Sequence, residues 1–239
     1  MLLTADFHNH SCLSPCGSLE LSPTVLIDEA MRKGVQLLAL TDHNSARNAP
    51  AFETLCKASG LFALPGLEVT TQEELHCLCL FRSAADAVAF GAFVEDHLLK
   101  IANKPEKWGD QIVVDADENV LDEVPYWLGT STDIPLTALG EYCLAAGGLF
   151  VPAHIDRPSQ SVLSQLGYLP DLPYSALEIR RDAGGLDTRG KTLVMGSDAH
   201  YPDDVGSRTC LVELEETNFE GLSRALLAGA VRFEGPYAE

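Results

Sequence analysis

Short apolar runs alternate with amphipathic stretches along most of this chain. Runs typical of β-strands occupy residues 4–10, 36–41, 62–70, 75–81, 148–152, 176–179, 192–195 and 210–213. Helical patterns lie between and after them, over residues 22–34, 49–58, 84–102, 135–146 and 218–228. Strands that alternate with helices predict an α/β fold, in which a parallel sheet is covered by helices on its outside.

Local signals support several of the helix ends. Ser22 can cap a helix whose first residue is Pro23, and Gly34 can end it. Gly60 closes the next helix, and Asn218 is a suitable cap for the last one. These signals support the helical assignment independently of the hydrophobic pattern.

Residues 103–133 break the alternation. They hold both tryptophans of the chain, Trp108 and Trp127, several acidic residues and one short strand-like run at 111–115. A connection this long inside a compact domain is usually functional or disordered, and the tryptophans favour a packed lid or a small insertion. We therefore predict one domain over residues 1–239, with an insertion at about 103–133 that shapes specificity.

Composition narrows the class of protein. Hydrophobic residues make up 46% of the 239 residues, which is ample for a buried core. No run is long and apolar enough to span a bilayer, and the first residues lack the features of a signal peptide. The odd number of cysteines, seven, then favours reduced thiols. We expect a cytoplasmic protein without a membrane partner; the sequence does not indicate its oligomeric state.

The formal net charge of −19 bears on the choice of partner. Nucleic-acid affinity depends on Lys and Arg side chains that neutralise phosphates, so a surface this acidic repels polyanions. We therefore expect no long nucleic acid as a partner. A small phosphorylated substrate remains compatible with the charge, because bound cations can compensate for it locally.

Six of the seven histidines fall in, or just after, strand-like runs and have carboxylates near them in sequence. Five of them fall in the segments 6–10, 41–44, 152–157 and 196–200, and His76 follows Glu68 by eight residues. Only His97, within a predicted helix, stands outside this set. Imidazole and carboxylate are ligands that suit zinc, manganese and iron. The clusters follow strand-like runs, as at the carboxyl ends of a barrel, and they predict a multinuclear metal centre that catalyses hydrolysis.

The spacing within each cluster supports this interpretation. His8 and His10 lie on the same face of a strand, because strand side chains alternate, and Asp198 and His200 repeat the spacing. The alternative is that these are hydrogen-bonded core histidines. Asp42, next to His43, suits either a carboxylate that orients a ligand or an Asx-type turn.

Glu68 and Arg157 suggest two further roles. Glu68 lies in an apolar stretch, where a carboxylate is costly unless it is paired or binds a metal, and its two oxygens can bridge two cations. His76 could be a core histidine, but the other clusters favour a metal ligand. Arg157 could hold a phosphate oxygen or form a surface ion pair with Asp156. Arg180 and Arg181 are weaker candidates for contact with a substrate anion.

In this order the clusters resemble the PHP (polymerase and histidinol phosphatase) family. The resemblance implies a distorted (β/α)7 barrel with two or three divalent transition metals (Mn, Fe or Zn) at the C-terminal ends of the strands. By matching position, it implies three sets of ligands: His8, His10, Glu68 and Asp198 for the first metal; Glu68, His76 and His154 for the second; and His43 and His200 for a third.

The third site departs from the family pattern. The family often has an aspartate shortly after the first histidine pair, whereas residues 14–20 of this chain contain none. Glu20 is a candidate substitute and Cys16 is the alternative, or the third site is weak or empty.

The resemblance and the residues together predict a metal-dependent phosphoesterase, a phosphoric ester hydrolase that acts on a small phosphorylated metabolite or nucleotide. A water between two cations becomes hydroxide near neutral pH and attacks phosphorus, while Arg157 neutralises phosphoryl charge. If the third metal is absent, His200 or His43 could protonate the leaving oxygen; a third metal would stabilise that oxygen directly. The alternatives are a metal-dependent C–N or C–O hydrolase on the same barrel and a metal-binding regulatory module without turnover.

Overall fold

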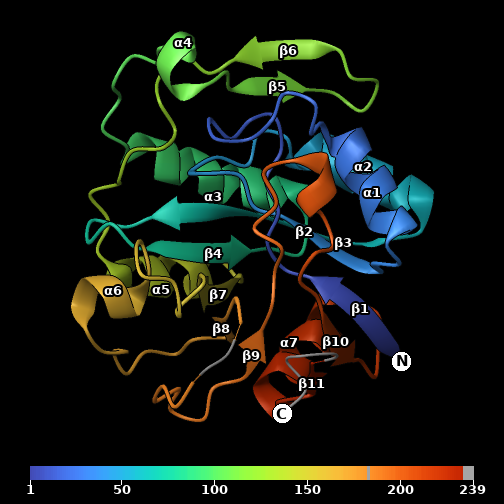
Figure 1. The fold of residues 1–239 in the computed structure, drawn as a ribbon, viewed down its shortest axis with the longest axis vertical. Helices are drawn as coiled ribbons and strands as arrows, with labels where there is room; N and C mark the ends of the chain where they lie inside the picture. The colour runs from blue at the N-terminus through green and yellow to red at the C-terminus, as the bar shows by residue number, and fades with distance from the viewer. Residues whose placement is uncertain (182–183, 234–239) are drawn as a thin grey trace.

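The computed structural model describes residues 1–181 and 184–233. Its main element is a curled sheet of seven strands (Figure 1). In spatial order these strands are β11 (Val231–Arg232), β10 (Cys210–Glu213), β1 (Leu2–Asp6), β2 (Leu37–Leu40), β3 (Phe62–Thr70), β4 (His76–Leu80) and β7 (Leu149–Pro152).

The main sheet is mixed, which corrects the prediction of a purely parallel sheet. β1, β2 and β3 are parallel, whereas β4 is antiparallel to both β3 and β7, and β10 is antiparallel to β1 and β11. The segment between β3 and β4 holds only residues 71–75. Such a short connection allows an antiparallel hairpin, because a parallel pair needs a crossover of a dozen or more residues.

A second, parallel pair of strands bridges the two sides of the curled sheet. It consists of β8 (Leu177–Glu178) and β9 (Leu193–Val194). Just before β8, the amide of Ser175 donates to the carbonyl of Phe150 in β7 at 2.9 Å. Just after β1, the amide of Phe7 donates to the carbonyl of Met195 at 3.3 Å. The small pair therefore contacts both β7 and the chain that follows β1.

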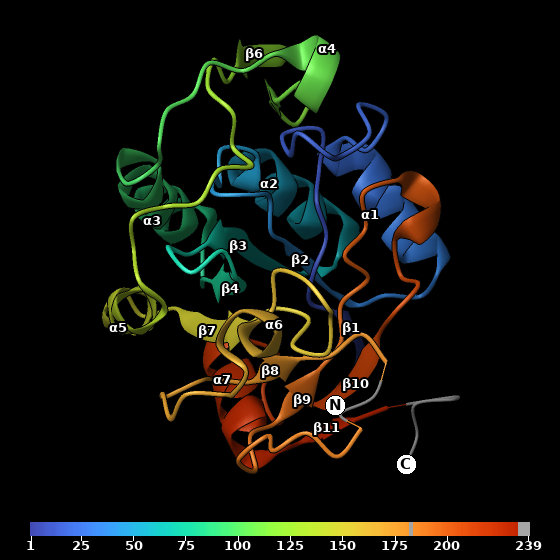
Figure 2. The same ribbon diagram turned by 60° about the vertical axis from the view of Figure 1, so that its left-hand side comes forward.

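Helices cover the outside of the sheet (Figures 1 and 2). They are α1 (Pro23–Arg32), α2 (Ala49–Ser59), α3 (Ala84–Asp96), α5 (Leu136–Ala145), α6 (Val162–Leu166) and α7 (Phe219–Ala228), with a short 3-10 helix at Pro202–Asp204. The predicted caps are present: Ser22 accepts from the amide of Val25, and Asn218 accepts from the amide of Gly221. None of the helices in residues 1–181 and 184–233 has the length and apolar character needed to cross a bilayer.

Helix α3 ends earlier than the pattern predicts. It stops at Asp96 and not at residue 102, and the next residues turn into bridges with the 103–133 region. Leu98 pairs with Thr132, and Ala102 pairs with Tyr126. Leu98 is buried in a small core away from the helix, so tertiary packing overrides the helical pattern.

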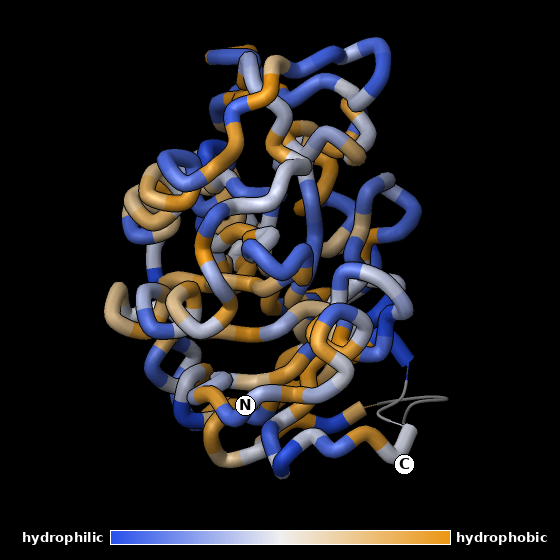
Figure 3. The backbone as a smooth tube through the Cα atoms, turned by 90° about the vertical axis from the view of Figure 1, so that its left-hand side faces the viewer, coloured by the Kyte–Doolittle hydropathy of each residue, from blue (hydrophilic) through white to orange (hydrophobic). Residues whose placement is uncertain are grey.

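The segment 103–133 is ordered and lies at one end of the molecule, far from α7 (Figures 1 and 2). It contains α4 (Pro105–Trp108) and an antiparallel hairpin of β5 (Ile112–Val114) and β6 (Val120–Glu123). The pattern predicted β5 but not α4 or β6. Apolar side chains of the segment pack around Leu13. The hydrophobic segments of the chain otherwise run mainly through the middle of the molecule (Figure 3).

Candidate metal centre

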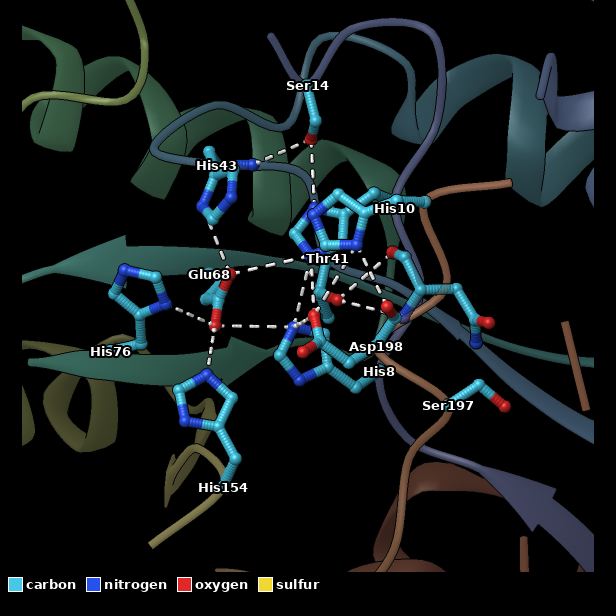
Figure 4. Close-up of polar contacts among 12 residues, drawn as sticks. His8, His10, Ser14, Thr41, His43, Glu68, His76, His154, Ser197 and Asp198 are labelled. Atoms are coloured by element: carbon cyan, nitrogen blue, oxygen red, sulfur yellow. Dashed lines mark hydrogen bonds and ion pairs between the residues drawn. The ribbon is translucent and has the colours of Figure 1, made fainter. Parts of the chain in front are cut away.

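The predicted ligands meet at one end of the curled sheet (Figure 4). His8 and His10 follow β1, His43 follows β2, and His154 follows β7. His76 is instead the first residue of β4. Because β4 runs antiparallel to β3, its start lies beside the end of β3, where Thr70 pairs with His76. The mixed sheet thus brings ligands from strand ends and from one strand start to the same place.

Glu68 stands at the centre of the cluster and is fully buried. Its Oε1 lies 2.8 Å from His76 Nδ1 and 3.2 Å from His154 Nε2. The same oxygen is 3.3 Å from His8 Nε2. Its Oε2 lies 3.0 Å from His43 Nδ1 and 3.5 Å from His10 Nε2. One carboxylate therefore faces five imidazoles, with the two oxygens directed to different subsets.

A second carboxylate, Asp198, joins the first histidine pair. The Nε2 atoms of His8 and His10 are 3.2 Å apart, and Asp198 Oδ1 lies 3.6 and 3.4 Å from them. Two ring nitrogens can approach this closely only if at least one presents a lone pair. Ring nitrogens that present lone pairs beside carboxylate oxygens form a set of ligands that suits a divalent cation.

Among residues 1–181 and 184–233, three groups of side chains have ligand atoms close enough together to hold an ion. They are His8, His10 and Asp198; His43, Glu68 and His76; and His10, His43 and His200. Glu68 Oε2, His43 Nδ1 and His154 Nδ1 are buried without a hydrogen-bond partner. The residues therefore fit a multinuclear centre. His43 contributes to two of the groups, whereas the resemblance placed it only with His200.

Neighbouring groups fix the orientation of the first two imidazoles. His8 Nδ1 lies 3.0 Å from Glu178 Oε2, so it donates there and leaves Nε2 free for a cation. His10 Nδ1 lies 2.9 Å from Ser14 Oγ, whose hydroxyl donates to Asp42 at 2.7 Å. Asp42 thus supports a candidate ligand through Ser14, one of the two roles that its sequence position suggested.

Sequence reasoning missed Glu178. This buried residue also accepts from the backbone amide of His154 at 2.8 Å, so it holds parts of two clusters that are far apart in sequence. Gly196 makes room for it, since a Cβ there would lie 2.7 Å from Glu178 Oε1. The only signal in the sequence was an acidic residue within the apolar run 176–179, the same signal that singled out Glu68.

The charges of the cluster favour the cation-binding forms of several groups. Burial would raise the pKa of Glu68, but the nearby charges of His76, His8 and His43 hold this pKa well below its usual range. Burial lowers the pKa of His76 to about 4, despite Glu68. For His10, burial and the charges of His200 and His43 lower the pKa well below its ordinary value. An ionised carboxylate and neutral imidazoles are the forms that ligate metals.

Two candidate ligands sit on backbone that non-glycine residues rarely adopt. His154 has a φ of 31° and Asp198 a φ of 53°. Such conformations cost free energy and persist only where the surroundings impose them, as at functional sites. The amide of Asp198 donates to the carbonyl of His8 at 2.8 Å, which ties the two ligand segments together.

A cleft of about 400 Å³ opens over the cluster. Residues from distant segments line it, including His43, Glu68, His76, Asp198 and His200, and also Cys16, Lys107, Trp108, Trp127 and Arg157. Arg157 Nη1 lies 3.5 Å from Asp198 Oδ2. Asp156 does not pair with the Arg157 side chain; it accepts from the backbone amides of Arg180 and Arg181, at 2.8 and 3.0 Å. The guanidinium of Arg157 is thus available to the cleft.

The two candidates for the third site differ in position. Glu20 is exposed and does not line the cleft, whereas Cys16 lines it beside His43 and His200. Burial raises the pKa of Cys16, but the charges of His43 and His200 outweigh it and lower the pKa to about 6. His97 lies away from the cleft and pairs with Asp133 at 2.7 Å, as expected for a histidine outside the set.

Comparison with known families identifies the class of protein. The model of the PHP domain matches residues 6–134, and the model of the PHP-associated region matches residues 182–231. The chain therefore belongs to the PHP family. No curated protein matches the sequence significantly.

Solved structures share the fold. The lesion-specific endonuclease Q of Pyrococcus furiosus is 16% identical with a TM-score of 0.70, covering 99% of this chain and 60% of that one. An amidohydrolase from Chromobacterium violaceum with bound sulfate is 21% identical (TM-score 0.59; 96% and 97% covered). A two-domain protein from Bacteroides vulgatus, described as containing a PHP-like metal-dependent phosphoesterase, is 18% identical (TM-score 0.56; 97% and 64% covered). The chain thus spans about 60% of the length of endonuclease Q.

The exclusion of long nucleic acids from the partners is wrong. Endonuclease Q, which shares this fold, has been solved in complex with a 27-mer duplex that carries an abasic lesion. Net charge sums over the whole chain, whereas a nucleic acid contacts a limited surface. In this chain the cleft is lined by the cationic side chains of Lys107 and Arg157, so the charge at the cleft differs from the net charge of the chain.

Proposed function

We propose that this chain is a metal-dependent phosphoesterase that hydrolyses phosphate esters of nucleotides or small metabolites. One observation carries the proposal: five imidazoles converge on the two oxygens of buried Glu68, with the Arg157 guanidinium beside them at the same cleft. Divalent cations held there would lower the pKa of a water molecule and polarise the phosphoryl oxygens.

Each candidate residue has a definite task in this proposal. His8, His10 and Asp198 hold one cation, and Glu68, His76 and His154 hold a second, with Glu68 shared between them. His43 and His200 provide a third position together with Cys16, which we favour over Glu20 because Cys16 lines the cleft. Manganese, iron and zinc all suit this ligand set.

Arg157 binds the substrate phosphate. Its guanidinium offers several donors in one plane, in a geometry that suits phosphate oxygens. It neutralises charge that builds up on the phosphoryl oxygens during the reaction. Where the third position holds no metal, His200 is the better placed of the two candidates to give a proton to the leaving oxygen, because it is the less buried: 22% of its side chain is exposed, against 10% for His43. With a third cation bound, that ion would stabilise the leaving oxygen instead.

The architecture behind this function is a distorted barrel that forms one domain over residues 1–239. In this proposal β8 and β9 close the gap between β7 and β1, so that seven strands (β1, β2, β3, β4, β7, β8 and β9) surround the core. The backbone bonds Ser175–Phe150 and Phe7–Met195 support this closure. The cations would lie at the end where the ligands meet, and the 103–133 insertion would form the outer wall of the cleft.

The proposal is tested by purifying the protein, loading it with Mn²⁺, Fe²⁺ or Zn²⁺, and measuring metal content and turnover together. Two or three ions per chain and hydrolysis of phosphate esters are expected. Hydrolysis of amides or lactones in place of phosphate esters would select a C–N or C–O hydrolase. Bound metal without turnover on any of these substrates would instead support a regulatory module.

A further inference from the structure

Both tryptophans of the chain lie at the cleft over the metal centre. Trp108 ends α4, and Trp127 follows β6, so the two come from opposite sides of the insertion. Their rings are stacked, with centroids 4.7 Å apart and planes inclined by 14°. Neither belongs to the small core of the insertion, which is built from aliphatic side chains around Leu13. Each ring uses part of one face on the other, both residues are half-buried, and the surface that remains borders the cleft.

The stack is held in place before any ligand arrives. Gly109, with a φ of 93°, packs so tightly that a Cβ there would lie 2.1 Å from the carbonyl oxygen of Pro15. A Cβ at Gly129 would lie 2.7 Å from the Trp127 ring. The amide of Trp127 donates to the carbonyl of Ile101 at 2.8 Å. A rigid aromatic surface loses little conformational freedom when it binds a ligand.

Lys107 places its cationic side chain over the ring of Trp108. Its Nζ lies 4.9 Å from the ring centroid, and the side chain is exposed. An exposed cation–π contact is weak, so a flat ring can displace it. The displaced ammonium would then be free to pair with an anionic group of the same ligand.

We propose that Trp108, Trp127 and Lys107 form a subsite for a nucleobase whose phosphate reaches the metal centre. The inference rests on the proposed phosphoesterase function and names its substrate class: a base beside a phosphate, in a free nucleotide or in a nucleic-acid strand. An aromatic surface accepts any base, because every base has a flat π-face. A pentose phosphate has no base, so the subsite does not contribute to its binding affinity.

Binding can be tested without catalysis, because the two tryptophans are the only ones in the chain and both lie in the subsite. Adenosine, which has no phosphate to hydrolyse, is expected to quench the tryptophan emission, whereas ribose is not. In Trp108→Ala the affinity for adenosine should fall about tenfold, and Trp108→Phe should restore most of it. Equal effects of adenosine and ribose on the wild-type emission would overturn the subsite.

Turnover then connects the subsite to the metal centre. Adenosine 5′-phosphate and ribose 5-phosphate share the same leaving hydroxyl and differ in the base. The ratio of their kcat/KM values should be about ten in the wild type and near one in Trp108→Ala. Tyr168→Ala, which removes an exposed aromatic side chain outside the cleft, should leave the ratio unchanged. A ratio near one in the wild type contradicts the proposal while leaving phosphoesterase activity intact.

The two proposals fail in different ways. Adenosine that binds the tryptophans without hydrolysis of any phosphate ester would keep the subsite and remove the phosphoesterase function. A competition experiment distinguishes a base in a free nucleotide from a base in a nucleic-acid strand. A short single-stranded DNA that displaces adenosine at a lower concentration than adenosine 5′-phosphate does would assign the subsite to a strand, and the reverse order would assign it to free nucleotides.

Discussion

The Glu68 cluster and the 103–133 insertion face each other across one cleft, yet they are built in opposite ways. Around Glu68 the side chains are charged and buried, and their positions are fixed by strands from the whole length of the chain. The insertion places two aromatic rings and an exposed lysine over the cluster from one continuous segment. Moving a ligand of the cluster therefore disturbs the whole sheet, whereas the insertion can vary without moving a metal ligand except where it contacts the segments of Asn44 and Pro15.

Asn44 connects the two regions. Its side chain donates to the carbonyls of Leu128 and Thr130 at 2.7 and 2.9 Å, and it accepts from the amide of Thr70. It is the residue next to His43, with a φ of 51°. The insertion is thus fastened to the same turn that presents a candidate ligand. This division suggests that the cluster determines the chemistry and the insertion determines the substrate.

The largest effect is expected from Glu68→Gln. Glutamine keeps the shape of the side chain but removes the charge that faces five imidazoles. Turnover should fall by more than the roughly 100-fold that loss of an outer partner of a ligand costs, and bound metal should fall with it. Elemental mass spectrometry and steady-state kinetics on the same sample provide the measurement. Full metal content with full activity would exclude a bridging role.

Glu178→Gln should have the next largest effect, on metal affinity. The amide can still occupy the space, but it holds His8 Nδ1–H less strongly, and metal affinity should fall by about 10- to 100-fold. Glu95→Gln is the matched control, since Glu95 is a buried glutamate that pairs with Arg47 away from the cleft. A metal titration of both variants should show a reduced metal affinity for Glu178→Gln and the wild-type affinity for Glu95→Gln. Equal metal affinity in both variants would show that Glu178 does not position a ligand.

Arg157→Ala should weaken the processing of phosphate esters by about tenfold in kcat/KM and leave metal content unchanged, because a charge-assisted contact to phosphate is lost. Arg180→Ala is the comparison, as Arg180 engages Asp156 through its backbone amide. Its effect should be smaller. If Arg157→Ala loses metal, the guanidinium supports the cluster and not the substrate.

Gly109→Ala should disturb the insertion and the Pro15 backbone that it packs against. The new Cβ would meet the Pro15 carbonyl, and the positive φ adds strain, so we expect a loss of about 1–3 kcal/mol in unfolding free energy and a change in tryptophan emission. Gly147→Ala is the control, because Gly147 also has a positive φ but an added Cβ there meets no neighbouring atom. The difference between the two variants therefore measures the effect of the clash. Metal content should remain at the wild-type value. Loss of metal in Gly109→Ala would contradict the independence of the two regions.

The smallest effect concerns Cys16. Its pKa is lowered to about 6, whereas burial raises the pKa of Cys12 and Cys56 to about 12. Iodoacetamide should therefore modify Cys16 first at pH 7, and the rate should fall as the pH drops through about 6, because the thiolate is the reactive form. Peptide mass spectrometry gives the order of modification. Metal loading should slow the reaction at Cys16; an unchanged rate would exclude Cys16 from the third position.

Much of the candidate site could be predicted from sequence because its side chains are exceptions to the local pattern. A carboxylate within an apolar run, as at Glu68, or a histidine just after one, as at His43, is costly to bury without a function. The spacing of His8 and His10 likewise predicted that their side chains meet, and their Nε2 atoms lie 3.2 Å apart, although β1 ends before them at Asp6. The α/β class and most element positions follow from hydrophobic spacing, and the cap at Ser22 from local hydrogen bonding.

Tertiary structure decided what depends on partners distant in sequence. Strand direction is one example: β4 pairs antiparallel with β3, and this brings His76 to Glu68. Helix α3 ends at Asp96 because Leu98 packs elsewhere, and Glu178 gains its place through His8 and His154. The tryptophan stack joins α4 to the segment after β6. The local sequence shows that burying a polar residue within an apolar segment is unfavourable. Which distant groups compensate for that unfavourable burial is decided only when the chain folds.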